Sequence, residues 1–280
     1  MDDVTTRGYC FLCFGPDHIY ELHNLLRTMK KVGNKLPISV ITSEEDQNLL
    51  NVSLFDSIIN FDFSHIFYNE QLTTFEHYCL IPRLLFNKYL PYDENIVTDI
   101  DMLCQYNPSH IWNIVSNIDQ PVVMCGMKND LSWHWGYISE VNDYLGKEVD
   151  SCTGGFFYIN KRHKDIDNYF NLLHEIYKNY DNYKLKRWFR GGRVDEPIFA
   201  IANNLMGYQV LEHLEHPIMA YNYNSDQIIP SKNQTYPYNK ELETYIPFIH
   251  MFRPHNENYF TILNKILNYD YGSSNISSVL

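Results

Sequence analysis

The chain has 280 residues, with 34 acidic against 22 basic ones and a net charge of −12. An acidic chain of this kind is not expected to bind nucleic acid broadly, because such proteins usually present a basic face. The hydrophobic fraction of 45% is enough for a real core. No apolar run approaches the roughly 18 residues that indicate a membrane span, so we expect no stable membrane insertion.

Two features suggest a cytoplasmic location. The start of the chain, Met1 to Val4, is acidic and lacks the basic residues of a signal peptide. The six cysteines lie largely in apolar, strand-like runs, which is typical of buried free thiols. The length and the Asn-, Tyr- and Ile-rich composition suggest a viral, phage or bacterial source, with the host cytoplasm as the location if viral.

The first 60 residues alternate between short apolar runs and amphipathic segments. We expect a strand over 9–14, a helix capped by Asp17 and ended by Gly33, a strand over 36–42 and a helix opened by Ser43. Strands that alternate with helices at these lengths predict a parallel α/β sheet.

The same patterns continue to the end of the chain. The later expected strands cover 57–63, 96–101, 121–127, 155–159, 208–211 and 245–250, and the later expected helices cover 74–89, 166–179, 197–205 and 260–267. We expect the tail, 271–280, to be frayed.

The most informative motif ends the apolar run that begins at Ile96. Asp99 and Asp101 are separated by one residue, and residues i and i+2 of a strand point to the same side. Two carboxylates that close raise each other's pKa unless a cation lies between them, so a divalent metal is the simplest explanation. A surface turn or a helix cap is the structural alternative.

Four elements in order resemble the glycogenin and galactosyltransferase-like family of GT-A glycosyltransferases (glycosyltransferase family 8). They are Leu90–Asp93 leading into Ile96–Asp101, then Thr153–Asn160, Asp195–Glu196 and His250–Pro254. The resemblance covers the chain from its first strand to about Pro254. It implies a single GT-A domain over 1–270, with a mixed, mostly parallel sheet flanked by helices.

The resemblance also implies a UDP-sugar donor and Mn²⁺ or Mg²⁺. Asp101 would be the more direct metal ligand, Asp99 would contact the ribose or the metal, and His250 would be the third ligand. The usual spacing between this His and the following basic residue and Pro is compressed here, which leaves the phosphate contact of Arg253 in doubt and makes His255 a competing candidate.

Other candidate residues have structural alternatives of comparable weight. Gly154 and Gly155 would let a sugar approach the backbone, or form a turn before a strand. Asp195 and Glu196 would act on the sugar and acceptor as catalytic carboxylates, or simply cap a helix. Arg83, in the helix before the acidic motif, would bind the nucleotide.

Two further segments invite a functional interpretation. The basic run Lys184–Arg193 has the composition of a mobile loop that closes over a diphosphate, although charge runs are usually solvated faces. The aromatic run Ser132–Tyr137 suggests an acceptor platform, with ordinary packing as the alternative.

The combined prediction is a metal-dependent transfer of a sugar from a UDP-sugar to a hydroxyl of a glycan or other acceptor. The resemblance favours retention at the anomeric carbon, but the residues leave inversion open. The alternatives are a sugar nucleotidyltransferase, a glycosyltransferase acting on modified DNA bases, and a sugar-nucleotide-binding protein without turnover.

Overall fold

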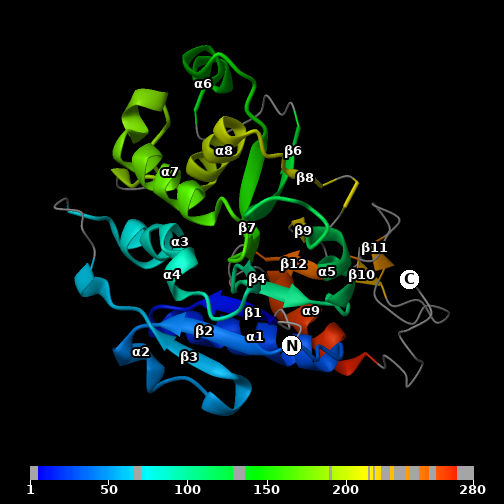
Figure 1. The fold of residues 1–280 in the computed structure, drawn as a ribbon. Helices are drawn as coiled ribbons and strands as arrows, with labels where there is room; N and C mark the ends of the chain where they lie inside the picture. Colours follow the sequence, from blue (N-terminus) through cyan, green and yellow to red (C-terminus); the bar gives the residue numbers. More distant parts are fainter. Residues whose placement is uncertain are drawn as a thin grey trace, which may run out of the picture.

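The computed structural model describes residues 6–65, 71–128, 136–188, 191–213, 215–216, 218–221, 228–229, 238–239, 246–251 and 257–269. Its main sheet has seven strands in the order β3-β2-β1-β4-β7-β6-β8 (Figure 1). The strands are β1 Arg7–Leu12, β2 Ile38–Thr42, β3 Ser57–Asn60, β4 Glu94–Thr98, β6 Val122–Met127, β7 Ser151–Asn160 and β8 Leu211–Glu212. Only β7 runs against its neighbours β4 and β6 among these strands, so the predicted mixed, mostly parallel sheet is confirmed.

Both faces of the main sheet are covered, which explains why its central strands are apolar without alternation. One face packs on α1 Pro16–Lys31, α5 Ser109–Val115 and α9 Glu257–Asn268. The other packs on α7 Ile166–Lys178 and α8 Asp195–Met206 (Figure 1). Successive residues of β1 enter the two opposite cores: Tyr9 and Phe11 enter one, and Cys10 enters the other.

A second, three-stranded sheet carries the chain away from the end of β4. Strand β5 Met102–Cys104 pairs antiparallel with β12 Phe248–His250, which pairs parallel with β9 Met219–Tyr221. The strand predicted from Ile96 to the two acids is confirmed as β4, but it ends at Thr98. Asp99 and Asp101 lie in the turn that follows rather than in the strand, because the chain leaves the main sheet there.

The helix predicted over 74–89 is broken into three pieces. A π-helical turn, η3 Glu76–Leu80, is followed by α3 Ile81–Leu84 and α4 Phe86–Tyr89. Pro82 supplies the reason, because it has no N–H to donate and its ring would clash with the carbonyl one α-helical turn earlier. The widened turn accommodates this residue.

The remaining predicted elements agree with the observed ones within a few residues. The two predicted helix caps differ in outcome. Asp17 does not cap α1, whose N-cap is Gly15, whereas the Ser43 hydroxyl caps α2 Glu44–Gln47 as expected. Helix α6 Ile138–Leu145 and helix α5 are absent from the prediction, because both are short. The other short elements are η1 Val52–Leu54, η2 Phe63–His65, η4 Tyr180–Tyr183, β10 Ile228–Ile229 and β11 Tyr238–Asn239.

The six cysteines are free thiols, and five of them are buried, as the sequence predicts. Among the described helices, none combines the length and the apolar character that crossing a membrane requires. The tail that we expected to be frayed, 271–280, lies outside the described residues.

Helix α8 offers a direct test of how firmly it is packed. Phe199 is fully buried on it, whereas Leu205 is 37% exposed on the same helix. We expect Phe199→Ala to lower the free energy of unfolding by about 3–5 kcal/mol, because a cavity replaces the ring. Leu205→Ala, the matched control, should cost less than about 1 kcal/mol. Urea unfolding followed by circular dichroism measures both, and equal losses would contradict this packing.

Candidate active site

Two carboxylates and an imidazole meet where β4 ends. Asp99 and Asp101 lie in the turn between β4 and β5, and His250 is the last residue of β12. The Nε2 atom of His250 is 3.1 Å from Oδ1 of Asp101 and 3.6 Å from Oδ2 of Asp99. The amide of Asp99 donates to Gly155 O at 3.2 Å, and the amide of Met251 donates to Asp101 O at 3.0 Å. Backbone hydrogen bonds thus hold the turn that makes the three side chains converge.

The donor set of this group fits a divalent cation. Ligand atoms of Asp99, Asp101 and His250 all lie within 4.8 Å of one another. Oxygen from carboxylates suits Mg²⁺ or Mn²⁺, and the imidazole nitrogen shifts the preference toward Mn²⁺. The three residues are those that the sequence singled out, and their convergence makes a metal-binding group available here.

Burial and charge oppose each other in this group. Burial would lower the pKa of His250, but the hydrogen bond that its ring donates to Asp101 and the charge of Asp99 raise this pKa above its ordinary value. Burial raises the pKa of Asp99, although the nearby Arg83 and His250 work in the other direction. Without a cation, a proton on His250 supplies part of the positive charge that the carboxylates need.

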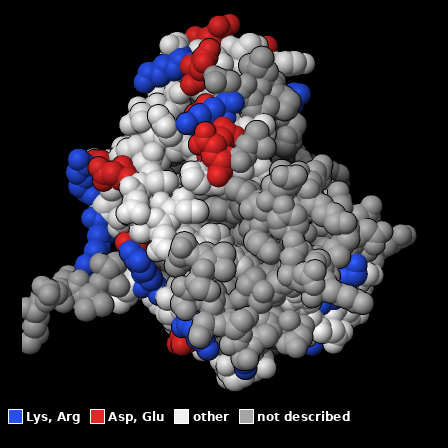
Figure 2. All heavy atoms as spheres, turned by 90° about the vertical axis from the view of Figure 1, so that its right-hand side faces the viewer, with Lys and Arg blue, Asp and Glu red and all other residues white. Residues whose placement is uncertain are grey.

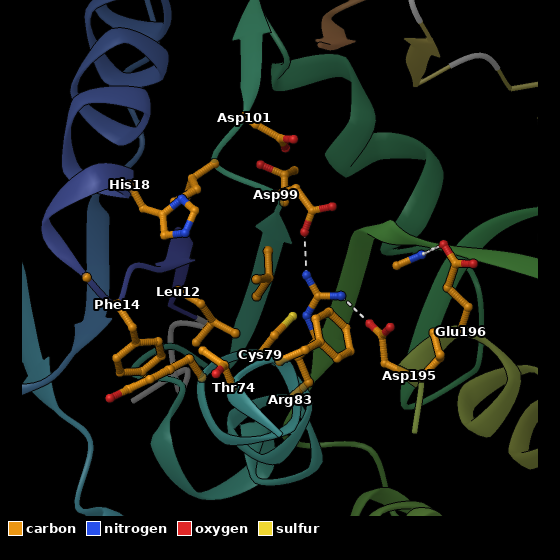
Figure 3. Close-up of a pocket in the computed structure, with 18 of the residues that line it drawn as sticks. Leu12, Phe14, His18, Thr74, Cys79, Arg83, Asp99, Asp101, Asp195 and Glu196 are labelled. Carbon is orange, nitrogen blue, oxygen red and sulfur yellow. Dashed lines mark hydrogen bonds and ion pairs between the residues drawn. The ribbon is translucent and has the colours of Figure 1, made fainter. Parts of the chain in front are cut away.

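Arg83 lies between two acidic residues from different parts of the fold. One terminal nitrogen donates to Oδ1 of Asp99 and the other to Oδ2 of Asp195, as the dashed lines in Figure 3 show. The guanidinium also packs over the Phe157 ring at 5.2 Å. Burial would lower its pKa, but the charges around it, those of Asp195 and Asp99 among them, raise the pKa well above the ordinary value. Arg83 is therefore a fixed positive charge beside the Asp99–Asp101–His250 group.

The adjacent acids Asp195 and Glu196 have different partners. Asp195 is 2% exposed and bound by Arg83. Glu196 is half-buried, and its Oε1 accepts from the Gly154 amide at 2.9 Å. Both acids lie in the first turn of α8, where the helix dipole also favours carboxylates. Each therefore has a partner elsewhere in the fold in addition to its place at the start of the helix.

The glycine pair is required by close contacts within the protein. A Cβ at Gly154 would lie 2.7 Å from Oδ2 of Asp195 and 2.8 Å from a terminal nitrogen of Arg83. A Cβ at Gly155 would approach the Met102 methyl at 3.0 Å and the His250 ring at 3.4 Å. A side chain at either position would push against the groups that form the site.

These residues share one large open cleft of about 2590 Å³. Ligand pockets commonly measure about 300–1,000 Å³, so there is room for two substrates side by side. The cleft is lined by Glu196, Arg83 and Gly154, and also by the Asp99–Asp101–His250 group. In Figure 3 the acidic turn and Asp195–Glu196 face the space on either side of Arg83.

The cleft contains a histidine, His18, that the sequence motifs did not indicate as a site residue. His18, on the first turn of α1, faces the acidic turn across the cleft (Figure 3). Its Nδ1 lies 3.0 Å from Oε2 of the buried Glu21, and that hydrogen bond raises the pKa of His18, with a smaller contribution from Asp101. Its position along the chain could have indicated this role. His18 lies on the first turn of the helix that follows the first parallel strand, and ligands bind at the carboxyl ends of such strands.

The basic run does not form a free phosphate-binding loop in its described part. Arg187 is held by both oxygens of Asp181, at 2.7 and 2.9 Å, and Arg193 donates to the buried Glu76 at 3.1 Å. Both guanidinium groups are thus engaged by protein carboxylates. Three of the predicted residues, Arg190, Arg253 and His255, lie outside the described residues, as does most of the aromatic run, 132–135.

The fold has solved counterparts, although no protein-family model matches the chain and no curated protein matches its sequence. An active-site mutant of LgtC has a TM-score of 0.57 at 16% identity, over 94% of this chain and 97% of that one. The bifunctional glycosyltransferase WbbM has a TM-score of 0.63 at 13% identity, over 97% and 51%. Mouse xyloside xylosyltransferase 1 has a TM-score of 0.53 at 11% identity, over 88% and 97%.

These proteins are glycosyltransferases, and the matches cover 88–97% of this chain. The predicted GT-A fold is therefore confirmed. At identities this low the likeness establishes the fold, and the chemistry has to be argued from the site.

Arg83 provides a test of the buried charge arrangement. Arg83→Met should lower the free energy of unfolding by about 3–5 kcal/mol near pH 7.5, because it leaves the buried Asp195 and the 24% exposed Asp99 without their shared cation. Losing the guanidinium removes the largest influence that lowers the Asp99 pKa, so that pKa rises further. The penalty exists above the raised pKa and should shrink as the pH falls through it.

Urea unfolding at about pH 7.5 and about pH 5.5 measures this difference. The control is Arg187→Met, whose partner Asp181 is 67% exposed, and it should cost less than about 1 kcal/mol at both pH values. A pH-independent loss for the Arg83 variant would show that it loses packing rather than charge balance.

Proposed function

We propose that this protein is a metal-dependent glycosyltransferase that moves a sugar from a UDP-sugar to a hydroxyl group. The convergence of Asp99, Asp101 and His250 carries the proposal, because it occurs in a GT-A fold and inside the cleft that holds Glu196. One solved structure of LgtC is a complex with donor and acceptor sugar analogues, which agrees with a sugar donor here. The single domain over 1–270 and the cytoplasmic location stay predictions.

Asp99, Asp101 and His250 would hold Mn²⁺ or Mg²⁺. When bound, the ion would neutralise the negative charge that develops on the diphosphate leaving group. The Arg83 guanidinium is shared by Asp99 and Asp195, so it would act on the donor mainly by holding Asp99 in place. Gly154, Gly155 and Arg253 are the other proposed donor-binding residues.

The adjacent acids Asp195 and Glu196 would have different roles. Asp195 orients Arg83 from its buried position. Glu196 keeps a carboxylate in the cleft, steadied by the Gly154 amide, and is our candidate for the group facing the anomeric carbon or the acceptor hydroxyl. Either stereochemical outcome could follow, depending on which of these two atoms it approaches.

Nucleic-acid binders usually present a basic surface, whereas the face in Figure 2 carries Asp and Glu as well as Lys and Arg among its described residues. Carbohydrate acceptors need no such basic surface, so a glycan acceptor agrees better with the net charge of −12.

Turnover is tested by incubating the protein with a panel of UDP-sugars and Mn²⁺ and measuring UDP release. We expect release with at least one donor, and a fall of about a hundredfold in kcat for Glu196→Gln, which keeps the shape but loses the charge. Binding of UDP without release from any donor would identify a sugar-nucleotide-binding protein instead. Release of pyrophosphate from UTP and a sugar phosphate would identify a nucleotidyltransferase.

Metal binding is tested by thermal unfolding with and without Mn²⁺. At a hundredfold excess over Kd the ion should stabilise the protein by about 2.7 kcal/mol. The ion needs a neutral imidazole, and the raised pKa of His250 means that protons compete with it at higher pH than for an ordinary histidine. The Mn²⁺-dependent rise in Tm should therefore be larger at about pH 8 than at about pH 6.

Asp101→Asn should abolish this rise in Tm. Asp17→Asn, which removes another acid of the cleft lining, should keep it. A rise that survives in the Asp101 variant would mean that the ion binds elsewhere.

A further inference from the structure

We propose that Trp188 is the stacking platform for a pyranose ring of the acceptor, which makes the acceptor a carbohydrate. The proposal rests on the proposed function and names its acceptor class. Trp188 lines the same cleft as Asp195 and Glu196 and is 44% exposed. A large aromatic side chain at the rim of a cleft is typical of a binding surface when its backbone is rigidly held.

The backbone around Trp188 is held at several points. Its amide donates to Gly192 O at 2.6 Å, and the Gly191 amide donates back to Trp188 O at 2.8 Å. Gly191 has φ of +85°, which favours glycine there. Arg187 precedes Trp188, and its guanidinium donates to Asp181 and, at 3.1 Å, to Gly191 O. The described residues on both sides of the indole are thus held by hydrogen bonds.

A buried ion pair fixes this turn against the opposite wall of the cleft. Arg193 donates to Glu76 through its backbone amide and its guanidinium, at 3.2 and 3.1 Å, and packs over the Tyr177 ring at 4.5 Å. Gly192 lies so close to Thr73 that a Cβ there would be 2.6 Å from the hydroxyl. The walls are therefore locked together close to where the indole lies.

The surroundings of the indole match the surface of a sugar ring. A pyranose has an apolar face of C–H groups and a rim of hydroxyls. Phe75 lies edge-on to the indole at 5.0 Å and extends the apolar surface. Thr73, Thr74 and Lys186, which line the same cleft, offer hydroxyl and ammonium groups for the rim.

A second exposed aromatic side chain lies on the segment next to this turn. Gly136 forms an isolated antiparallel bridge with Leu185, which brings Tyr137 beside the basic run. Tyr137 is 63% exposed, and the Lys186 ammonium lies over its ring at 5.0 Å. The aromatic surface thus extends beyond one ring, which favours an oligosaccharide over a monosaccharide acceptor.

Position in the chain links the platform to the chemistry. Asp195 follows Trp188 by seven positions, and the anchored Arg193 lies between them. A ring stacked on the indole would lie in the same cleft that Glu196 lines. The acceptor hydroxyl would then be delivered to the donor sugar by a rigid surface, which lowers the entropy cost of the encounter.

The test separates donor chemistry from acceptor binding. Using the UDP-sugar that supports UDP release, we would measure donor hydrolysis alone, then the increase in UDP release caused by an oligosaccharide that binds the wild-type protein on a printed glycan array. Trp188→Ala should leave hydrolysis unchanged and raise the acceptor KM roughly tenfold or more, as expected for loss of an aromatic stacking surface. Trp188→Phe should restore most of the affinity.

Tyr20→Ala is the matched control, since Tyr20 is 49% exposed but lies outside the cleft lining, and it should change neither rate. An unchanged acceptor KM in Trp188→Ala would overturn the proposal. So would the absence of any bound glycan on the array while hydrolysis proceeds, because the acceptor would then belong to another class, such as a protein. Absence of UDP release from every donor would instead overturn the proposed function and this inference with it.

Discussion

The site depends on one buried cation that two distant segments share. Arg83 is bound at once by Asp99, at the end of a central strand, and by Asp195, at the start of α8. Asp195 is almost fully buried, so its charge depends on this partner, since burying an unpaired ion costs several kcal/mol. Asp99 is 24% exposed and shares the same guanidinium. Gly154 is a glycine because the pair passes directly against its backbone. The same charge balance thus fixes the wall of the cleft beside the Asp99–Asp101–His250 group.

The break between the two sheets is the second constraint. Because the chain turns after β4, Asp99 and Asp101 leave the main sheet and meet His250, which arrives on β12 about 150 residues later. Pairing of His250 with Met102 in the small sheet sets this meeting. The π-helical turn around Pro82 plays a comparable role, since the helical segment that it shapes carries both Arg83 and Glu76. Irregular backbone is concentrated where the site is built.

Much of this could be predicted, because local patterns carry it. The buried strands are continuous apolar runs, and helices such as α7 repeat their apolar residues at helical spacing. Asp99, Asp101, Arg83, Asp195, Glu196 and His250 were all identified from motifs and order along the chain. The break at Pro82, the turn at Asp99–Asp101 and the place of His18 were not, because each depends on which segments pack together rather than on which residues are adjacent.

The sequence by itself determined the α/β class, the alternation that builds a parallel sheet and the residue types able to hold a divalent cation. Those features follow from periodicity and chemistry within short windows. Only the tertiary structure decided which partner each of the two adjacent carboxylates, Asp195 and Glu196, has. Asp195 is committed to Arg83 and Glu196 is turned toward Gly154 and the cleft, although the two are neighbours in sequence. That difference arises from contacts with residues 42 to 112 positions away, which no local pattern records.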